Sequence, residues 1–253
     1  MRSLIKSLIN RMGFDIIRSS HKENKRKLKD FYYESDEAFM SFHKEAIKVS
    51  DSPHDPAIFP LRLYNTLQFL IYSLSLEGDI VECGCFKGRS SYLFCTYAKY
   101  ILGEFCGEGY HIFDSFQGIS EPGINDQINS PDFGKTGHHF LDSGAFSASL
   151  EHVKKTLESF PNIHYHPGWI PDTFDDIPDL SYKFVHLDLD LYDPIRASID
   201  YFYPRLVPGG VIVIDEYGFP RWPGAKRAVD EFCDKQNIKC VGLTTGNGVI
   251  IKV

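Results

Sequence analysis

The chain has 253 residues, enough for one well-buried domain with room for an extension. Its composition, 43% hydrophobic and 24% charged, is that of a soluble globular protein. The formal net charge of −7 argues against nucleic acid or an anionic membrane as the main partner.

Targeting signals and cysteine motifs are both missing from the sequence. No apolar run approaches the roughly 18 residues of a membrane span, and residues 1–17 lack the continuous hydrophobic region of a signal peptide. The six cysteines form no CxxC pair and show no zinc-finger spacing. These features favour free thiols in a reducing compartment and predict a cytoplasmic protein without a transmembrane segment.

Residues 1–76 are predicted to form an N-terminal helical extension that precedes the main domain. Residues 1–20 have the pattern of a basic amphipathic helix, which favours packing against the domain or a partner subunit over a membrane surface. Two more helices are predicted at 37–48 and 60–75, the second with proline in its first turn. The spare N-terminal helix indicates a homo-oligomer.

A strand predicted at 79–83 leads into a turn that contains Gly84, Gly88 and Ser90. Its spacing, E-x-G-x-x-x-G, departs from the G-x-G-x-x-G of dinucleotide sites and lacks the G-K-[ST] of a phosphate-binding loop. Glycine at 84 allows close approach of the backbone to a ligand, and glycine at 88 suits tight packing at a helix start. Glu82 suits an ammonium group better than a pyrophosphate. The turn therefore favours S-adenosylmethionine (SAM), which carries an amine and a sulfonium.

A second strand, predicted at 110–113, ends at Asp114 and Ser115. A carboxylate at this place in an α/β fold commonly holds a ribose diol. The alternative is that Asp114 caps the next turn. Its occurrence together with Glu82 and Gly84 favours the nucleoside interpretation.

Residues 116–145 are rich in Gly, Pro, Asn, Asp and Ser and are too long for a structureless connector, so we predict a lid or substrate loop. His138 and His139 near its end are candidate general bases, although exposed loop histidines are more often only solvated. Further along the chain, Trp169 is placed either to stack on an adenine or to join the core.

Two apolar runs end in acidic residues. The first, at 184–187, delivers Asp188 and Asp190, and the second delivers Asp215 and Glu216. A helix between them predicts a right-handed crossover, so both strand ends open on one edge of the sheet. Carboxylates that converge there repel one another and need a cation or a proton. All-oxygen ligands favour a hard metal ion such as Mg²⁺.

The order of elements predicts the fold class. Helices are expected at 147–159, 194–206 and 221–236, and further strands at 163–166, 184–187, 211–214, 240–244 and 248–253. Seven strands, with helices between the first five and a closing hairpin, are the layout of a Rossmann-like class I methyltransferase. We therefore predict an α/β domain over 77–253 with a mostly parallel sheet and helices on both faces.

From Asp79 to Gly248 the sequence resembles the macrocin O-methyltransferase family, whose members use SAM and a metal ion to methylate sugar hydroxyls. The resemblance rests on DIVECGCFKGRSS, HIFDSFQGI, GWIPDTF, LDLDLYDPIRASIDYFYPRLVPGGVIVIDEYG and GAKRAVDEF. It implies that Asp188, Asp215 and Glu216 bind Mg²⁺ and that Asp188 is also the catalytic base. It further implies an acceptor, a small molecule or a glycan, that carries a sugar hydroxyl.

Two positions depart from the family pattern. The family usually has glycine between the two aspartates and a second aspartate before the tyrosine, where this chain has Leu189 and Glu216. Glu216 still offers oxygen ligands but is one methylene longer. Three alternatives stay open at this point: a catechol-type metal-dependent methyltransferase, a non-catalytic SAM-binding scaffold, and a nicotinamide-dependent oxidoreductase.

Overall fold

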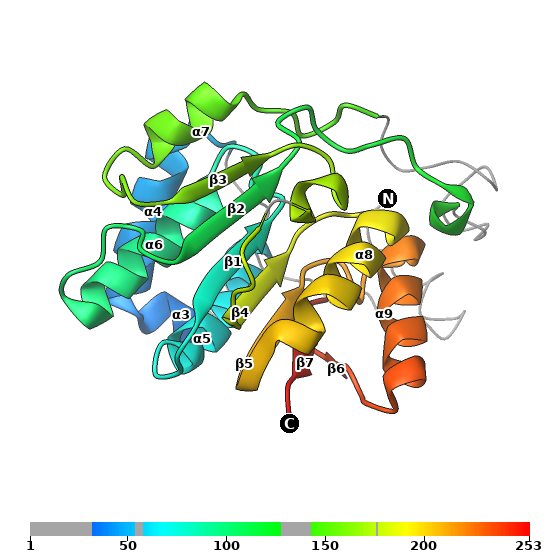
Figure 1. Cartoon of the computed structure of the whole chain (residues 1–253). Coiled ribbons are helices and arrows are strands. Elements are labelled where there is room, and N and C mark those ends of the chain that lie inside the picture. Colours follow the sequence, from blue (N-terminus) through cyan, green and yellow to red (C-terminus); the bar gives the residue numbers. More distant parts are fainter. Residues whose placement is uncertain (1–31, 54–57, 128–142, 176) are drawn as a thin grey trace, which may run out of the picture. The chain divides into compact units, whose positions relative to one another are not determined.

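The computed structural model describes residues 32–53, 58–127, 143–175 and 177–253 (Figure 1). The chain forms two compact units, residues 1–40 and 41–253. In the first, helix α3 (Tyr32–Ser35) is followed by the start of α4 (Glu37–Val49), and the ring of Tyr33 packs edge-on against Phe39. The helix predicted at 37–48 is thus confirmed, whereas the one predicted within 1–20 lies outside the described residues.

The second unit contains the predicted seven-stranded sheet, in the order β3-β2-β1-β4-β5-β7-β6. The first five strands are parallel, and β7 runs antiparallel to both β5 and β6. The strands are β1 (Asp79–Cys83), β2 (Tyr110–Asp114), β3 (His164–Pro167), β4 (Tyr182–Leu187), β5 (Leu206–Ile214), β6 (Val241–Gly242) and β7 (Gly248–Ile251).

Helices cover both faces of this sheet (Figure 1). Helices α8 and α9 pack on one face and on each other, while α5 and α6 lie against the other face. The helices of this unit, apart from α4, are α5 (Phe59–Ser73), α6 (Arg89–Leu102), α7 (Leu150–Thr156), α8 (Tyr192–Phe202) and α9 (Pro223–Gln236), with 3₁₀ turns η2 (Ile124–Asp126), η4 (Asp172–Phe174) and η5 (Tyr203–Arg205). The predicted Rossmann-like class is confirmed.

Strand alternation decides which side chains enter which layer. Val81 and Val185 belong to the apolar core formed with α8 and α9. Their neighbours Glu82 and His186 therefore point to the opposite face, where the ring of Phe94 from α6 packs edge-on against His186. A buried acid and a buried histidine thus lie side by side in this layer.

Several predicted boundaries were wrong. The helix expected over 147–159 covers only Leu150–Thr156, and the strand expected over 240–244 covers only Val241–Gly242. The helix expected over 194–206 ends at Phe202, because η5, which contains Pro204, tightens the last turn. Strand β5 then begins at Leu206 rather than Val211. Its glycines extend the ladder, since Gly209 donates to the carbonyl of Lys252 and Gly210 accepts from its N–H, both at 2.8 Å.

Candidate active site

A cavity of about 740 Å³ lies at the carboxyl edge of the parallel strands, where open α/β sheets bind their ligands. Its walls come from the segments after the first five strands and from α5. Most of the residues singled out from the sequence line it: Gly84, Ser90, Asp114, Ser115, Trp169, Asp188, Asp215 and Glu216. Glu82 and Gly88 are the two that do not appear in this lining.

Gly84 joins the predicted cofactor turn to the predicted metal site. Its φ of +82° is in the left-handed region, and a Cβ added there would lie 1.9 Å from the backbone oxygen of Asp188. The close approach that requires glycine is thus to the turn after β4. The turn after β1 and the first acidic residue are therefore packed directly against each other.

The three carboxylates that the resemblance assigned to a metal do converge. Asp188, Asp215 and Glu216 each offer an oxygen, and these atoms all lie within 4.8 Å of one another. The strand ladder fixes their backbones, because Asp188 donates its N–H to Cys83 and Asp215 donates to Leu187, both at 2.9 Å. The structure thus confirms that the three carboxylates lie close together at the ends of β4 and β5.

The electrostatics of this acidic cluster favour a cation. Burial, and next the charge of Asp215, raise the pKa of Asp188 to about 6. Burial, and then Asp188 and Asp215, raise the pKa of Glu216 well above its usual range. Oε2 of Glu216 is buried and has no hydrogen-bond partner among the described residues. An all-oxygen donor set with an orphaned carboxylate oxygen fits a hard divalent ion.

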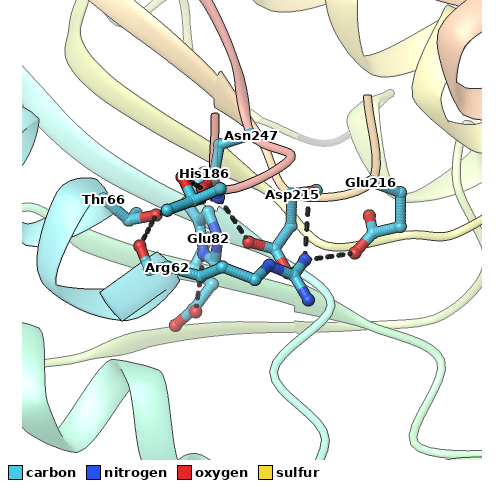
Figure 2. A network of polar contacts seen from close by, with 8 residues as sticks. Arg62, Thr66, Glu82, His186, Asp215, Glu216 and Asn247 are labelled. Carbon is cyan, nitrogen blue, oxygen red and sulfur yellow. Dashed lines mark hydrogen bonds and ion pairs between the residues drawn. The ribbon is translucent and has the colours of Figure 1, made fainter. Parts of the chain in front are cut away.

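Two residues that the sequence analysis missed hold Asp215 from either side (Figure 2). Arg62 of α5 contacts Oδ2 of Asp215 and lies 3.4 Å from Oε1 of Glu216. Asn247, between β6 and β7, donates its side-chain amide to Oδ1 of Asp215 at 2.7 Å. An arginine inside an amphipathic helix and an asparagine in a turn carry no motif, so only their placement could reveal them.

Glu82 lies in the core, 0% exposed, with both oxygens engaged. Oε2 accepts from the hydroxyls of Ser91 and Tyr110. Oε1 pairs with Nδ1 of His186 at 3.0 Å (Figure 2). His186 lines the cavity, and its Nε2 has no partner among the described residues. This placement offers Glu82 a structural role behind the cavity wall, and its predicted contact with the cofactor stays a prediction.

Asp114 and Ser115 line the cavity while also shaping the turn after β2. The carboxylate of Asp114 accepts the N–H of Cys85 through Oδ2 and that of Phe116 through Oδ1, both at 2.7 Å. The hydroxyl of Ser115 donates to the carbonyl of Gly118 at 2.9 Å. Both are therefore turn-forming, as the alternative interpretation of Asp114 held, and their proposed ribose contact is not tested by this arrangement.

The predicted loop over 116–145 is described only at its ends. The backbones of Ile119, Gly144 and Ala145 pair with one another at 2.9 Å, which draws the two ends together. His138 and His139 lie outside the described residues. Trp169, 39% exposed, presents its side chain to the cavity.

Comparison with known proteins identifies the family. Residues 63–243 match the family described as Macrocin-O-methyltransferase (TylF). The chain belongs to the macrocin O-methyltransferase family. It is therefore a SAM-dependent O-methyltransferase, and the nicotinamide-dependent alternative is disfavoured.

Individual relatives agree with this family. Mycinamicin III 3''-O-methyltransferase of Micromonospora griseorubida is 26% identical over 231 residues, which span 85% of this chain and 87% of that protein. The 8-demethyl-8-(2,3-dimethoxy-alpha-L-rhamnosyl)-tetracenomycin-C 4'-O-methyltransferase of Streptomyces olivaceus is 27% identical over 164 residues, 62% of this chain and 60% of that protein. The structure of the O-methyltransferase NovP matches 83% of this chain and 88% of its own at 22% identity, with a TM-score of 0.63, which supports the fold.

Other expectations are not decided by these findings. Among the helices of the described part of the chain, none combines the length and apolar character needed to cross a bilayer. A cytoplasmic location, a homo-oligomer and a domain boundary between 76 and 77 stay predictions.

Proposed function

We propose that this macrocin O-methyltransferase family member moves the methyl group of SAM to a sugar hydroxyl, with Mg²⁺ held by Asp188, Asp215 and Glu216. The observation that carries the proposal is the convergence of these three carboxylates within 4.8 Å in the cavity that the turn after β1 also lines. The cofactor turn and the acidic cluster meet there through Gly84 and Asp188.

The sugar acceptor is supported by the relatives. One of them is named for a rhamnosyl-tetracenomycin substrate, and the description of the family names macrocin. A sugar offers neighbouring hydroxyls, which can approach one hard metal ion together. A catechol is also a vicinal diol, so a catechol-type acceptor is the alternative that the experiment below has to separate.

The chain's residues divide the work as follows. When bound, Mg²⁺ would lower the pKa of a coordinated hydroxyl. Asp188 accepts the hydroxyl proton, and the acceptor oxygen forms a bond to the SAM methyl carbon as the carbon–sulfur bond breaks. The products are the methyl ether and S-adenosylhomocysteine (SAH).

The remaining residues position the cofactor. The turn that contains Gly84, Gly88 and Ser90 holds the methionine end, with Glu82 supporting it from the core. Asp114 and Ser115 hold the ribose, and Trp169 stacks on the adenine. In this proposal their contribution is orientation, because in-line attack requires the sulfonium and the acceptor oxygen to be held in one geometry.

Calorimetric titration with SAH and with Mg²⁺, on the wild type and on Asp215→Ala, tests the two halves separately. We expect SAH to bind both proteins and Mg²⁺ to bind only the wild type. A panel of glycosides and catechols, followed by mass spectrometry for a gain of one methyl group, then identifies the acceptor class. Methylation of catechols alone would refute the sugar assignment, and Mg²⁺ binding that survives in Asp215→Ala would refute the metal site.

A further inference from the structure

An arginine occupies part of the proposed metal site. Nη2 of Arg62 contacts Oδ2 of Asp215 and also donates to the backbone oxygen of Asp215 at 2.9 Å. The same nitrogen lies 3.4 Å from Oε1 of Glu216 (Figure 2). Arg62 is 6% exposed, so these are buried charge–charge contacts rather than surface pairs.

The guanidinium is held by aromatic rings as well as by the acids. Its carbon lies 5.1 Å from the ring centre of Phe59 and 4.3 Å from that of Phe219. All three side chains line the cavity. Nε of Arg62 is buried and has no hydrogen-bond partner among the described residues, so part of the arginine's donor capacity is unused in this position.

One positive charge does not balance the cluster. Arg62 faces Asp188, Asp215 and Glu216, and Asp190 adds a fourth carboxylate to the same electrostatic group. Three or four acids against one guanidinium leave room for a divalent ion. The arginine and the ion would compete for the same oxygens, because a metal ligand and a salt-bridge acceptor use the same lone pairs.

The contacts of Asp215 decide which donor gives way. Oδ1 is held by Asn247, which is 0% exposed and whose own Oδ1 accepts the hydroxyl of Thr245 at 2.9 Å. Oδ2 is held by Arg62, whose side chain borders the open cavity. A metal ion that arrives through the cavity therefore meets the arginine's contact, not the asparagine's.

We infer that Arg62 is an exchangeable counter-ion of the metal site. It neutralises Asp215 and Glu216 while the site holds no metal, and it yields Oδ2 of Asp215 when a divalent ion binds. It thereby offsets the repulsion between the acidic side chains, which stabilises the fold, and it weakens metal binding. This inference rests on the proposed Mg²⁺ site and adds to it a residue that sets how tightly the ion is held.

Calorimetric Mg²⁺ titration of SAH-saturated protein, together with thermal unfolding in EDTA, tests the inference. Arg62→Met removes the charge and keeps an unbranched side chain. Because a like charge next to the ion is removed, we expect Mg²⁺ to bind about tenfold more tightly or better. We also expect a lower unfolding temperature in EDTA, since the acids lose their cation, and a larger rise on adding Mg²⁺.

The two opposite effects separate this role from a merely structural one, because a residue that only supports the fold would lower both stability and metal affinity. Arg205→Met is the matched control: Arg205 also stacks on a ring, that of Tyr201 at 4.0 Å, but does not line the cavity. Its Mg²⁺ affinity should equal that of the wild type.

Each outcome decides the inference. Mg²⁺ affinity in Arg62→Met that equals or falls below that of the wild type overturns it and leaves the proposed metal site standing. If Mg²⁺ binds neither the wild type nor Arg62→Met, both the inference and the proposed metal site are overturned. If Arg62→Met does not fold, Arg62→Gln decides: glutamine removes the charge but keeps a side-chain amide that can donate to Asp215. Its Mg²⁺ affinity should exceed that of the wild type, and an equal or lower affinity overturns the inference.

Discussion

Asn247 donates its side-chain amide to Oδ1 of Asp215 at 2.7 Å, so the turn between β6 and β7 supports a carboxylate at the end of β5 (Figure 2). Thr245 donates its hydroxyl to Oδ1 of Asn247 at 2.9 Å, and Asn65 of α5 donates in turn to Thr245. The antiparallel hairpin therefore does more than close the sheet. It fixes the orientation of one proposed metal ligand.

Asn247→Ala should weaken Mg²⁺ binding and turnover by about 10- to 100-fold, because groups that orient a metal ligand typically contribute that much. SAH affinity should be unchanged, since Asn247 is not among the cavity-lining residues. Calorimetric titrations with Mg²⁺ and with SAH measure the two affinities.

The control is Asn162→Ala, which removes a comparable 2.8 Å amide–carboxylate hydrogen bond to Glu108 at an exposed site. It should leave Mg²⁺ affinity and turnover as in the wild type. Wild-type Mg²⁺ affinity in Asn247→Ala would show that Asp215 needs no such support.

Asp188→Asn should reduce turnover at least about 100-fold, because it removes both a proposed proton acceptor and a metal ligand. SAH should still bind, since the proposed cofactor turn is intact. Single-turnover methyl transfer and SAH calorimetry measure the two effects. Asp200→Asn, which alters an exposed partner of Arg196 on α8, is the control. Substantial activity in Asp188→Asn would exclude Asp188 as the base.

Glu82→Ala should destabilise the protein by about 3–5 kcal/mol, because it leaves His186 and Tyr110 without their buried acceptor. Burial alone would lower the pKa of His186, but the hydrogen bond and charge of Glu82 raise it. Denaturant unfolding measures the loss, and Glu82→Gln, which keeps one acceptor oxygen, should cost less. Wild-type stability combined with lost SAH binding would instead show that Glu82 contacts the cofactor directly.

The stability of the protein should fall as the pH drops from about 6.5 to about 4, partly through His166. Burial, and then the neighbouring His111 and His164, lower the pKa of His166 to about 4. The unfolded chain, whose histidine has a pKa of about 6.5, binds the proton first, so acid favours unfolding across this window.

His166→Gln keeps an amide that can pair with His111 and removes the titration. The slope of the unfolding free energy against pH between 4 and 6.5 should become shallower. The decrease should correspond to less than one proton taken up on unfolding. His152→Gln, on α7 and not among the groups that shift the pKa of His166, is the control. An unchanged slope in His166→Gln would show that other groups cause the acid sensitivity.

The order of strands and helices, and the acids at the ends of β4 and β5, could be predicted from the sequence. Both signals are local: apolar runs give the strands, and the right-handed crossover rule brings two consecutive parallel strand ends to one edge. That is why Asp188, Asp215 and Glu216 converge as expected. The predicted boundaries near Phe202 and Leu206 failed because a proline-containing 3₁₀ turn and a glycine-bearing strand extension blur the local pattern.

Only the tertiary structure decided which residues surround those acids. Arg62 contacts an acid 153 positions away, and His186 pairs with an acid 104 positions away. Such partners depend on which face of a helix or strand meets the site once the layers pack, and single residues of this kind carry no spacing that marks them. The sequence determined that three acids converge at this edge. The packing of α5 and of the β6–β7 turn determined that an arginine and an asparagine hold Asp215.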